Sequence, residues 1–135
     1  MKKFIDVSDT KQALAPLTSS AAMTAIPLNC TGYGRVKYTF NLGTSLAGGS
    51  FNASIFNAST SGATFTAITS GSLAVISSVS TPCVAVIDVP VDNAKPWQEV
   101  SAAVANSDIP VSCVAELYRP VNVSRGSTAQ QTVTV

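Results

Sequence analysis

Side chains that carry acid–base chemistry are scarce in this sequence. It contains no histidine, which removes mechanisms that pair serine or cysteine with histidine and metal sites built on imidazole. Asp88 and Asp92 flank residues 89–91, and Glu99 follows. A glycosidase needs two carboxyl groups roughly 5–10 Å apart in a cleft. Asp88 falls on the outward side of an alternating strand and Asp92 in a turn, so we interpret these carboxylates as structural.

No other catalytic motif stands out. The G-x-S-x-G sequence of serine hydrolases is absent, and no helix is expected after the glycines of residues 31–34 to make a phosphate cradle. A catalytic lysine must be buried to lower its pKa, whereas Lys37 lies on the polar side of its strand. We therefore predict that the chain is not an enzyme and holds no cofactor.

Three cysteines, Cys30, Cys83 and Cys113, are widely spaced, with no C-x-x-C pair that would indicate zinc. Each lies in or beside an apolar run, where a free cysteine acts as a small hydrophobic residue. We predict no metal site and free thiols, in a chain made in a reducing cytoplasm.

Charge excludes further classes of partner. Eight Lys and Arg residues balance seven Asp and Glu residues, and the pI is near 7.7. Nucleic-acid-binding domains usually have a pI above about 9, so we expect no nucleic-acid partner. No apolar run approaches the length of a membrane span, and the charges near the N-terminus interrupt any secretory leader, so we expect no membrane partner.

Residues 38–87 contain no ionisable Asp, Glu, Lys or Arg. Such a stretch is kept soluble by hydroxyl and amide groups. It suits a surface that contacts another protein, and it is also typical of a β-domain that is simply rich in serine and threonine.

Period-two alternation of apolar residues is the dominant pattern and indicates β-strands. It is clearest in Tyr33–Leu42, where Val36, Tyr38, Phe40 and Leu42 are apolar while Arg35, Lys37, Thr39 and Asn41 face the other way. Pro90 should confine the end of its strand to a sheet edge. Residues 97–104 fit a strand or a short helix. We expect about eight strands, at residues 23–28, 33–42, 51–57, 63–69, 72–79, 83–91, 97–104 and 110–118, with 51–57 and 63–69 forming a hairpin.

This spacing predicts an all-β fold, an antiparallel β-sandwich or jelly-roll-like single domain. We expect its core to include Val36, Tyr38, Phe40, Ile55, Phe65, Val111, Cys113 and Leu117. We place the domain at residues 17–120, with an N-terminal arm at 1–16 and a C-terminal arm at 121–135. At most one helical turn is expected in the first arm, near residues 8–14.

The two arms are the expected interfaces. Residues 121–135 are too polar to hold a core, and Thr132, Val133, Thr134 and Val135 alternate β-branched side chains, which suits addition to the strand edge of a neighbouring subunit. Trp97, the sole tryptophan, is interpreted as a core or interface anchor, with a binding platform for sugars or bases as the alternative. The candidate interface residues are Lys2, Lys3, Phe4, Ile5, Trp97, Val121, Val123, Arg125, Thr132, Val133, Thr134 and Val135.

A series of segments over residues 12–120 resembles the small all-β auxiliary head proteins of tailed bacteriophages, which decorate or cement the capsid. The segments are Leu14-Ala15-Pro16, residues 25–28, Thr31-Gly32-Tyr33, the alternation of residues 36–42, the hairpin Ser61-Gly62-Ala63-Thr64-Phe65-Thr66, and residues 110–120. The chain departs from that pattern by lacking an Asp before the hairpin glycine and by extending about fifteen residues beyond the usual end.

The resemblance implies a virion structural protein that binds the major capsid protein and stabilises the head. It also implies contacts with sister copies, a trimer being one arrangement, and a location on the capsid surface after synthesis in the host cytoplasm. A neck or tail location is a variant of this hypothesis. The alternative is a carbohydrate- or receptor-binding β-sandwich module of a tail or fibre, which would display two or more exposed aromatic residues on one face.

Overall fold

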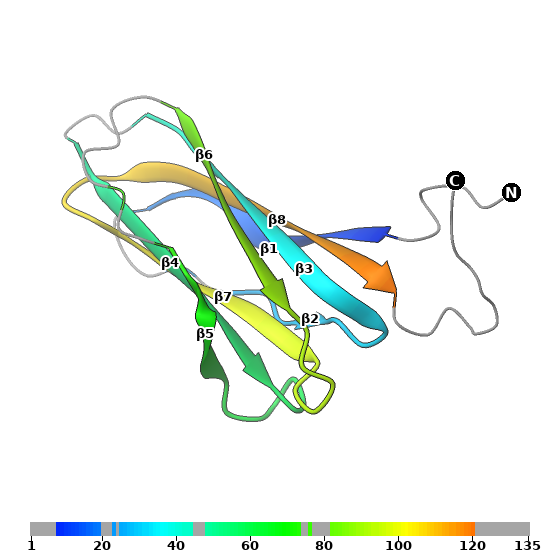
Figure 1. Ribbon diagram of the computed structural model, residues 1–135. Coiled ribbons are helices and arrows are strands. Elements are labelled where there is room, and N and C mark those ends of the chain that lie inside the picture. The colour runs from blue at the N-terminus through cyan, green and yellow to red at the C-terminus, as the bar shows by residue number, and fades with distance from the viewer. Residues whose placement is uncertain are drawn as a thin grey trace, which may run out of the picture.

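A computed structural model describes residues 8–19, 23, 25–44, 48–73, 76 and 82–120 of the chain. These residues contain eight β-strands and no helix (Figure 1). The strands are β1 (Ser8–Ser19), β2 (Leu28–Asn29), β3 (Tyr33–Leu42), β4 (Ser50–Ala58), β5 (Thr66–Ser72), β6 (Cys83–Pro90), β7 (Trp97–Ala105) and β8 (Ile109–Pro120).

The strands form two four-stranded antiparallel sheets packed face to face. The first sheet has the order β1-β8-β3-β6 and the second β2-β7-β4-β5. Within them β1 pairs with β8, β2 with β7, β3 with β6 and β4 with β5, as if one long hairpin had been rolled up. Pairs β3–β8 and β4–β7 complete the sheets. This is the jelly-roll arrangement, so the predicted fold class is confirmed.

Alternation explains the core between the sheets. In β3, Val36, Tyr38, Phe40 and Leu42 are buried, while the residues between them face outward. The rings of Phe40 and Phe51 join the two sheets at a centroid distance of 5.6 Å. All the predicted core residues are buried except Phe65, which is only half-buried because it lies in the loop before β5.

Most predicted strands are confirmed. The strand Tyr33–Leu42 has the expected bounds, and β4 and β5 form the expected hairpin. Residues 97–105 form a strand, which decides between the two alternatives. Strand β6 lies at an edge of the first sheet, as Pro90 predicted.

The N-terminal arm requires a correction. The helical turn expected near residues 8–14 is wrong, and most of the segment assigned to the arm belongs to the sandwich, because residues 8–19 form β1 alongside β8. The ladder shifts register between Gln12 and Leu14 and again between Leu14 and Leu17. As a result the adjacent residues Ala13 and Leu14 are both buried, which breaks the period-two pattern.

Two other strand predictions differ from the structure. The strand expected at 23–28 is reduced to Leu28–Asn29. Strand β5 ends at Ser72, where the next strand was expected to begin. In that expected strand Ile76 forms an isolated bridge with Phe51, whereas residues 74, 75 and 77–79 lie outside the described part. The arm at 121–135 also lies outside it.

Candidate interaction surface

The candidate catalytic carboxylates do not form a cluster. Asp88 lies on β6 of the first sheet and Glu99 on β7 of the second, while Asp92 Oδ1 accepts a hydrogen bond from the Ala94 N–H at 2.9 Å in a turn. In the described ranges no three His, Cys, Asp or Glu residues are grouped so that they could hold a metal ion. Asp92 therefore has a local structural role.

The cysteine side chains act as packing groups. All three are free, with Cys30 and Cys113 buried and Cys83 half-buried. Burial raises the pKa of the Cys30 and Cys113 thiols to about 12. Both therefore stay protonated near neutral pH, where a thiol is a weak nucleophile.

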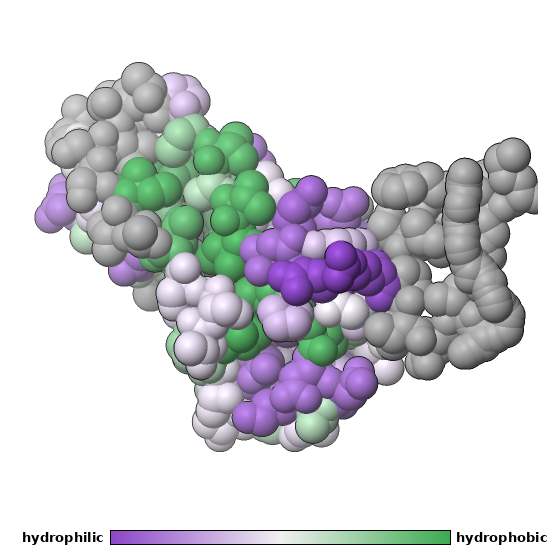
Figure 2. Space-filling view, in the orientation of Figure 1, coloured by the Kyte–Doolittle hydropathy of each residue, from purple (hydrophilic) through white to green (hydrophobic). Residues whose placement is uncertain are grey.

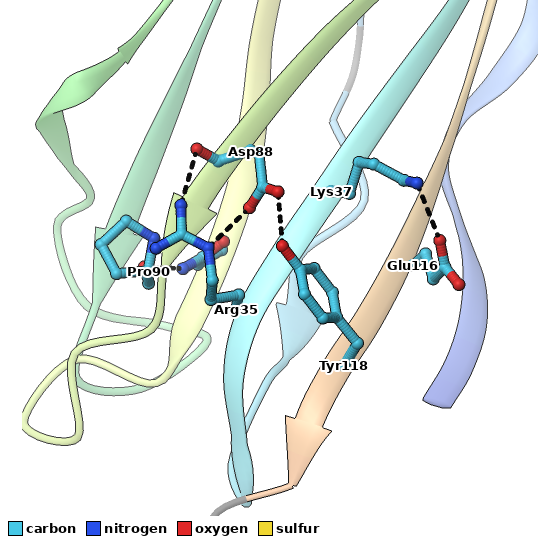
Figure 3. A network of polar contacts seen from close by, with 7 residues as sticks. Arg35, Lys37, Asp88, Pro90, Glu116 and Tyr118 are labelled. Carbon is cyan, nitrogen blue, oxygen red and sulfur yellow. Dashed lines mark hydrogen bonds and ion pairs between the residues drawn. The ribbon is translucent and has the colours of Figure 1, made fainter. Parts of the chain in front are cut away.

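One end of the outer face of the first sheet is polar (Figure 3). Arg35 on β3 donates from Nε to Asp88 Oδ1 at 2.9 Å and from Nη2 to the Asp88 carbonyl at 3.3 Å. The Tyr118 hydroxyl on β8 donates to Asp88 Oδ2. Lys37 Nζ lies 3.4 Å from Glu116 Oε1. Three neighbouring strands are thus linked across this end by charged and hydroxyl groups.

These contacts also define the electrostatics of the polar end. The hydrogen bonds to Asp88 raise the pKa of the Arg35 guanidinium, which remains charged. Both side chains are about one-third exposed, so water screens the pair. The network therefore fixes side-chain positions more than it stabilises the fold.

The other end of the same face carries three exposed valines, with Thr39 and Asn41 of β3 between β6 and β8. Val84 and Val86 on β6 and Val114 on β8 are 62%, 50% and 39% exposed. Thr39 of β3 pairs with both Val86 and Val114, so these three lie in one row. We call Val84, Val86 and Val114 the valine patch. Figure 2 shows hydrophobic residues gathered beside a hydrophilic band on this side of the molecule.

Trp97 is half-buried at the start of β7. Its neighbour Gln98 points into the core, so Trp97 and Glu99 face outward on the second sheet. Phe56 of β4 pairs with Glu99 and faces the same way, also half-buried. Two aromatic residues thus share the outer face of the second sheet, on diagonal positions of neighbouring strands.

The remaining predicted interface residues, Lys2, Lys3, Phe4, Ile5, Val121, Val123, Arg125, Thr132, Val133, Thr134 and Val135, lie outside the described residues. Sequence reasoning missed Val84, Val86 and Val114 as surface residues, and Phe56 as a neighbour of Trp97. A signal was present for β6, because residues 83–87 are apolar on both faces of the strand, unlike those of β3. For Phe56, the alternation of residues 51–57 already placed its side chain on the face of the strand opposite to that of Ile55.

The described residues include no helix that is long and apolar enough to cross a membrane.

No protein-family model and no curated protein matches this chain. Among solved structures, the CBM22-1–GH10 modules of the Clostridium thermocellum endo-1,4-β-D-xylanase 10B complexed with xylohexaose are similar, with 11% identity and a TM-score of 0.48. The match covers 90% of this chain and 27% of that one. The infectious bursal disease virus Gt strain structure is similar with 12% identity and a TM-score of 0.32, covering 95% and 44%. The chain spans less than half the length of either, and these similarities carry no argument about function.

Proposed function

We propose that this chain is a virion structural protein, a decoration or cement protein that binds the major capsid protein at the capsid surface and stabilises the head. The valine patch is the observation that carries the proposal. Val84 and Val86 are exposed as outward neighbours on β6, and Val114 lies in the row of Val86 on the other side of Thr39. Apolar side chains exposed together on a sheet face favour contact with another protein. The capsid as partner comes from the resemblance of the segments in residues 12–120, because a jelly roll alone hosts many functions.

Binding of this kind needs no catalysis and no cofactor. One face offers the valine patch for burial, and the neighbouring charges on β3, β6 and β8, those of Lys37, Asp88 and Glu116, stand one row farther along that face. Each contact is small, so occupancy would rely on many copies bound to one particle, where individually weak contacts add through avidity. The proposal includes contacts between sister copies of the chain on the capsid surface, and synthesis of the chain in the host cytoplasm.

The proposal is tested by adding the purified chain to phage capsids assembled from the major capsid protein alone. Val114→Lys places a charge in the valine patch, on a central strand, and should lower the fraction of occupied sites at least tenfold. Thr69→Lys adds the same charge to an exposed position on β5 of the second sheet and serves as the control. Full occupancy with Val114→Lys would show that this face is not the capsid contact.

The arms are a separate part of the proposal. We expect residues 121–135, and secondarily residues 2–5, to contact capsid or sister copies. Deletion of residues 121–135 should leave the sandwich folded, since β8 ends at Pro120, and should weaken incorporation into particles. If the truncated chain is incorporated to the same extent and the capsid melting temperature is unchanged, the C-terminal arm is not what attaches the chain to the capsid.

A carbohydrate-binding module is the second candidate, favoured by the shared outer face of Trp97 and Phe56. Aromatic rings with nearby polar groups are what a sugar-binding face requires, and Glu99 lies directly opposite Phe56 and two residues after Trp97 on β7. Titration with hexasaccharides of xylose, glucose and N-acetylglucosamine tests it by calorimetry. Binding that is lost in both Trp97→Ala and Phe56→Ala supports this candidate, and absence of heat with all three sugars rejects it for these ligands.

A further inference from the structure

Three of the four sheet edges in the described residues carry features that prevent pairing with another strand. Strand β1 has two register shifts, and β2 has only two residues. Strand β5 pairs with β4 through a register shift. Bulges and short strands are the usual devices by which natural proteins protect their edges.

Strand β6 lacks such a device over most of its length. Its ladder with β3 is regular from Arg35↔Pro90 to Leu42↔Cys83. Residues 83–87 carry no charge, and the outward side chains of this segment are the exposed Val84 and Val86. A strand with apolar residues on both faces is typical of a position covered on both sides.

The backbone groups on the free side of β6 follow from one hydrogen bond. The Val91 N–H donates to the Gly34 carbonyl at 3.0 Å, so the odd-numbered residues of this segment direct their N–H and C=O groups toward β3. The backbone N–H and C=O groups of Val84, Val86 and Asp88 therefore point to the free edge. Among the described residues, no strand pairs with that edge.

The open edge has defined limits. Pro82 and Pro90 lack an N–H and stand four residues before and after Val86. The Pro90 carbonyl already accepts a hydrogen bond from Gln98 Nε2 at 3.1 Å. The Asp88 carbonyl accepts from Arg35 Nη2 at 3.3 Å and keeps a second lone pair. The available groups are thus centred on Val86.

We propose that β6 pairs with β6 of a second copy, antiparallel about a two-fold axis at Val86. Val86 then faces Val86, and Val84 faces Asp88 of the other copy, so no like charges meet. Each facing pair exchanges both of its backbone hydrogen bonds. The two four-stranded sheets become one continuous sheet, and the two valine patches join across it.

A second copy fits this edge better than an unfolded peptide. An unfolded segment loses about 1–2 kcal/mol of backbone entropy per residue when it is ordered as a strand. Two copies of β6 are already extended and held by β3. This pairing is a contact between sister copies, and it should form in solution without a capsid. It rests on the proposed virion role only for where in the particle the contact would occur.

Sedimentation velocity over a concentration series tests the pairing. The full chain should form a dimer, and Val86→Lys, which sets two ammonium groups opposite each other, should raise the dissociation constant at least tenfold. Asn41→Lys is the matched control, because Asn41 is exposed on the same face but lies on β3, one strand in from the edge. Circular dichroism checks that each variant is folded.

Charge complementation then tests the axis. Val86→Lys and Val86→Glu should each be monomeric alone and should form a heterodimer when mixed, detected by native mass spectrometry. A wild-type chain that stays monomeric at every concentration, a dimer that survives Val86→Lys, or a trimer overturns the proposal. Loss of the dimer on deletion of residues 121–135 overturns it in favour of the arm. None of these results depends on whether the chain binds capsids.

Discussion

The hydroxyl of Tyr38 on the first sheet donates a hydrogen bond to Gln98 Oε1 on the second sheet at 2.9 Å, in the interior of the sandwich. Gln98 is the fully buried polar residue of the described core, and its Nε2 donates onward to the Pro90 carbonyl. Burial raises the pKa of Tyr38, so its hydroxyl keeps the proton that it donates. The two sheets are thus joined by oriented hydrogen bonds as well as by apolar packing.

Tyr38→Phe should destabilise the protein by about 1–3 kcal/mol, because it leaves the Gln98 oxygen buried without a donor. The free energy of unfolding in urea measures this loss. In the double variant Tyr38→Phe with Gln98→Met, the orphaned oxygen is also removed. Its cost should therefore be smaller than the sum of the two single costs, and strict additivity would show that the two side chains are not coupled.

Phe40→Ala should cost about 3–5 kcal/mol, because the ring is fully buried against Phe51 and its removal leaves a cavity. The same urea titration measures it. Val84→Ala serves as the control, since Val84 is exposed, and should change stability by no more than about 0.5 kcal/mol. A loss below roughly 1 kcal/mol for Phe40→Ala would contradict its place in the core.

Stability should fall as the pH rises from about 9 toward 12. The buried Cys30 and Cys113 thiols have a folded-state pKa of about 12 against an ordinary value of about 9, so the native state holds more protons than the unfolded state in this window. Below pH 9 neither thiol lowers the free energy of unfolding. Above pH 9 each thiol lowers it by up to about 1.4 kcal/mol per pH unit.

Cys113→Ala should make this alkaline slope shallower. Val111→Ala is the control, because it removes buried atoms from the same strand without removing a titrating group. Urea unfolding at several pH values between 8 and 11 gives both slopes. Equal slopes in wild type and Cys113→Ala would contradict the prediction.

Thiol labelling of the native protein should distinguish the cysteines by burial. At pH 8 a disulfide reagent should react with the half-buried Cys83 first, and with Cys30 and Cys113 only after unfolding. Because all three thiols are free, reducing agent should leave the melting temperature unchanged. Peptide mapping that finds Cys113 labelled as fast as Cys83 would contradict the burial.

The sequence predicted those elements in which one face is buried and the other solvated. Strand β3 follows this rule from Arg35 to Leu42, so its core residues could be derived from alternation alone. Strand β1 could not, because its bulges place Ala13 and Leu14 on the buried side together. The valine patch depends on which strand lies at an edge and which strands adjoin it. That order is set by the pairing of β3 with β6 and with β8, strands far apart in the chain, which no local pattern contains.

The register of β1 against β8 also determines how the molecule responds to mechanical force. Ser8 pairs with Tyr118, so the chain enters β1 and leaves β8 at one end of two neighbouring antiparallel strands. Tension applied between residues 8 and 120 would load the hydrogen bonds of this ladder one pair at a time, as in the opening of a zipper, rather than all together in shear. A pulling experiment between those two points should therefore open the sandwich at low force, starting at the polar end, passing Val114 midway along the ladder and ending at the pair Ser19↔Ile109.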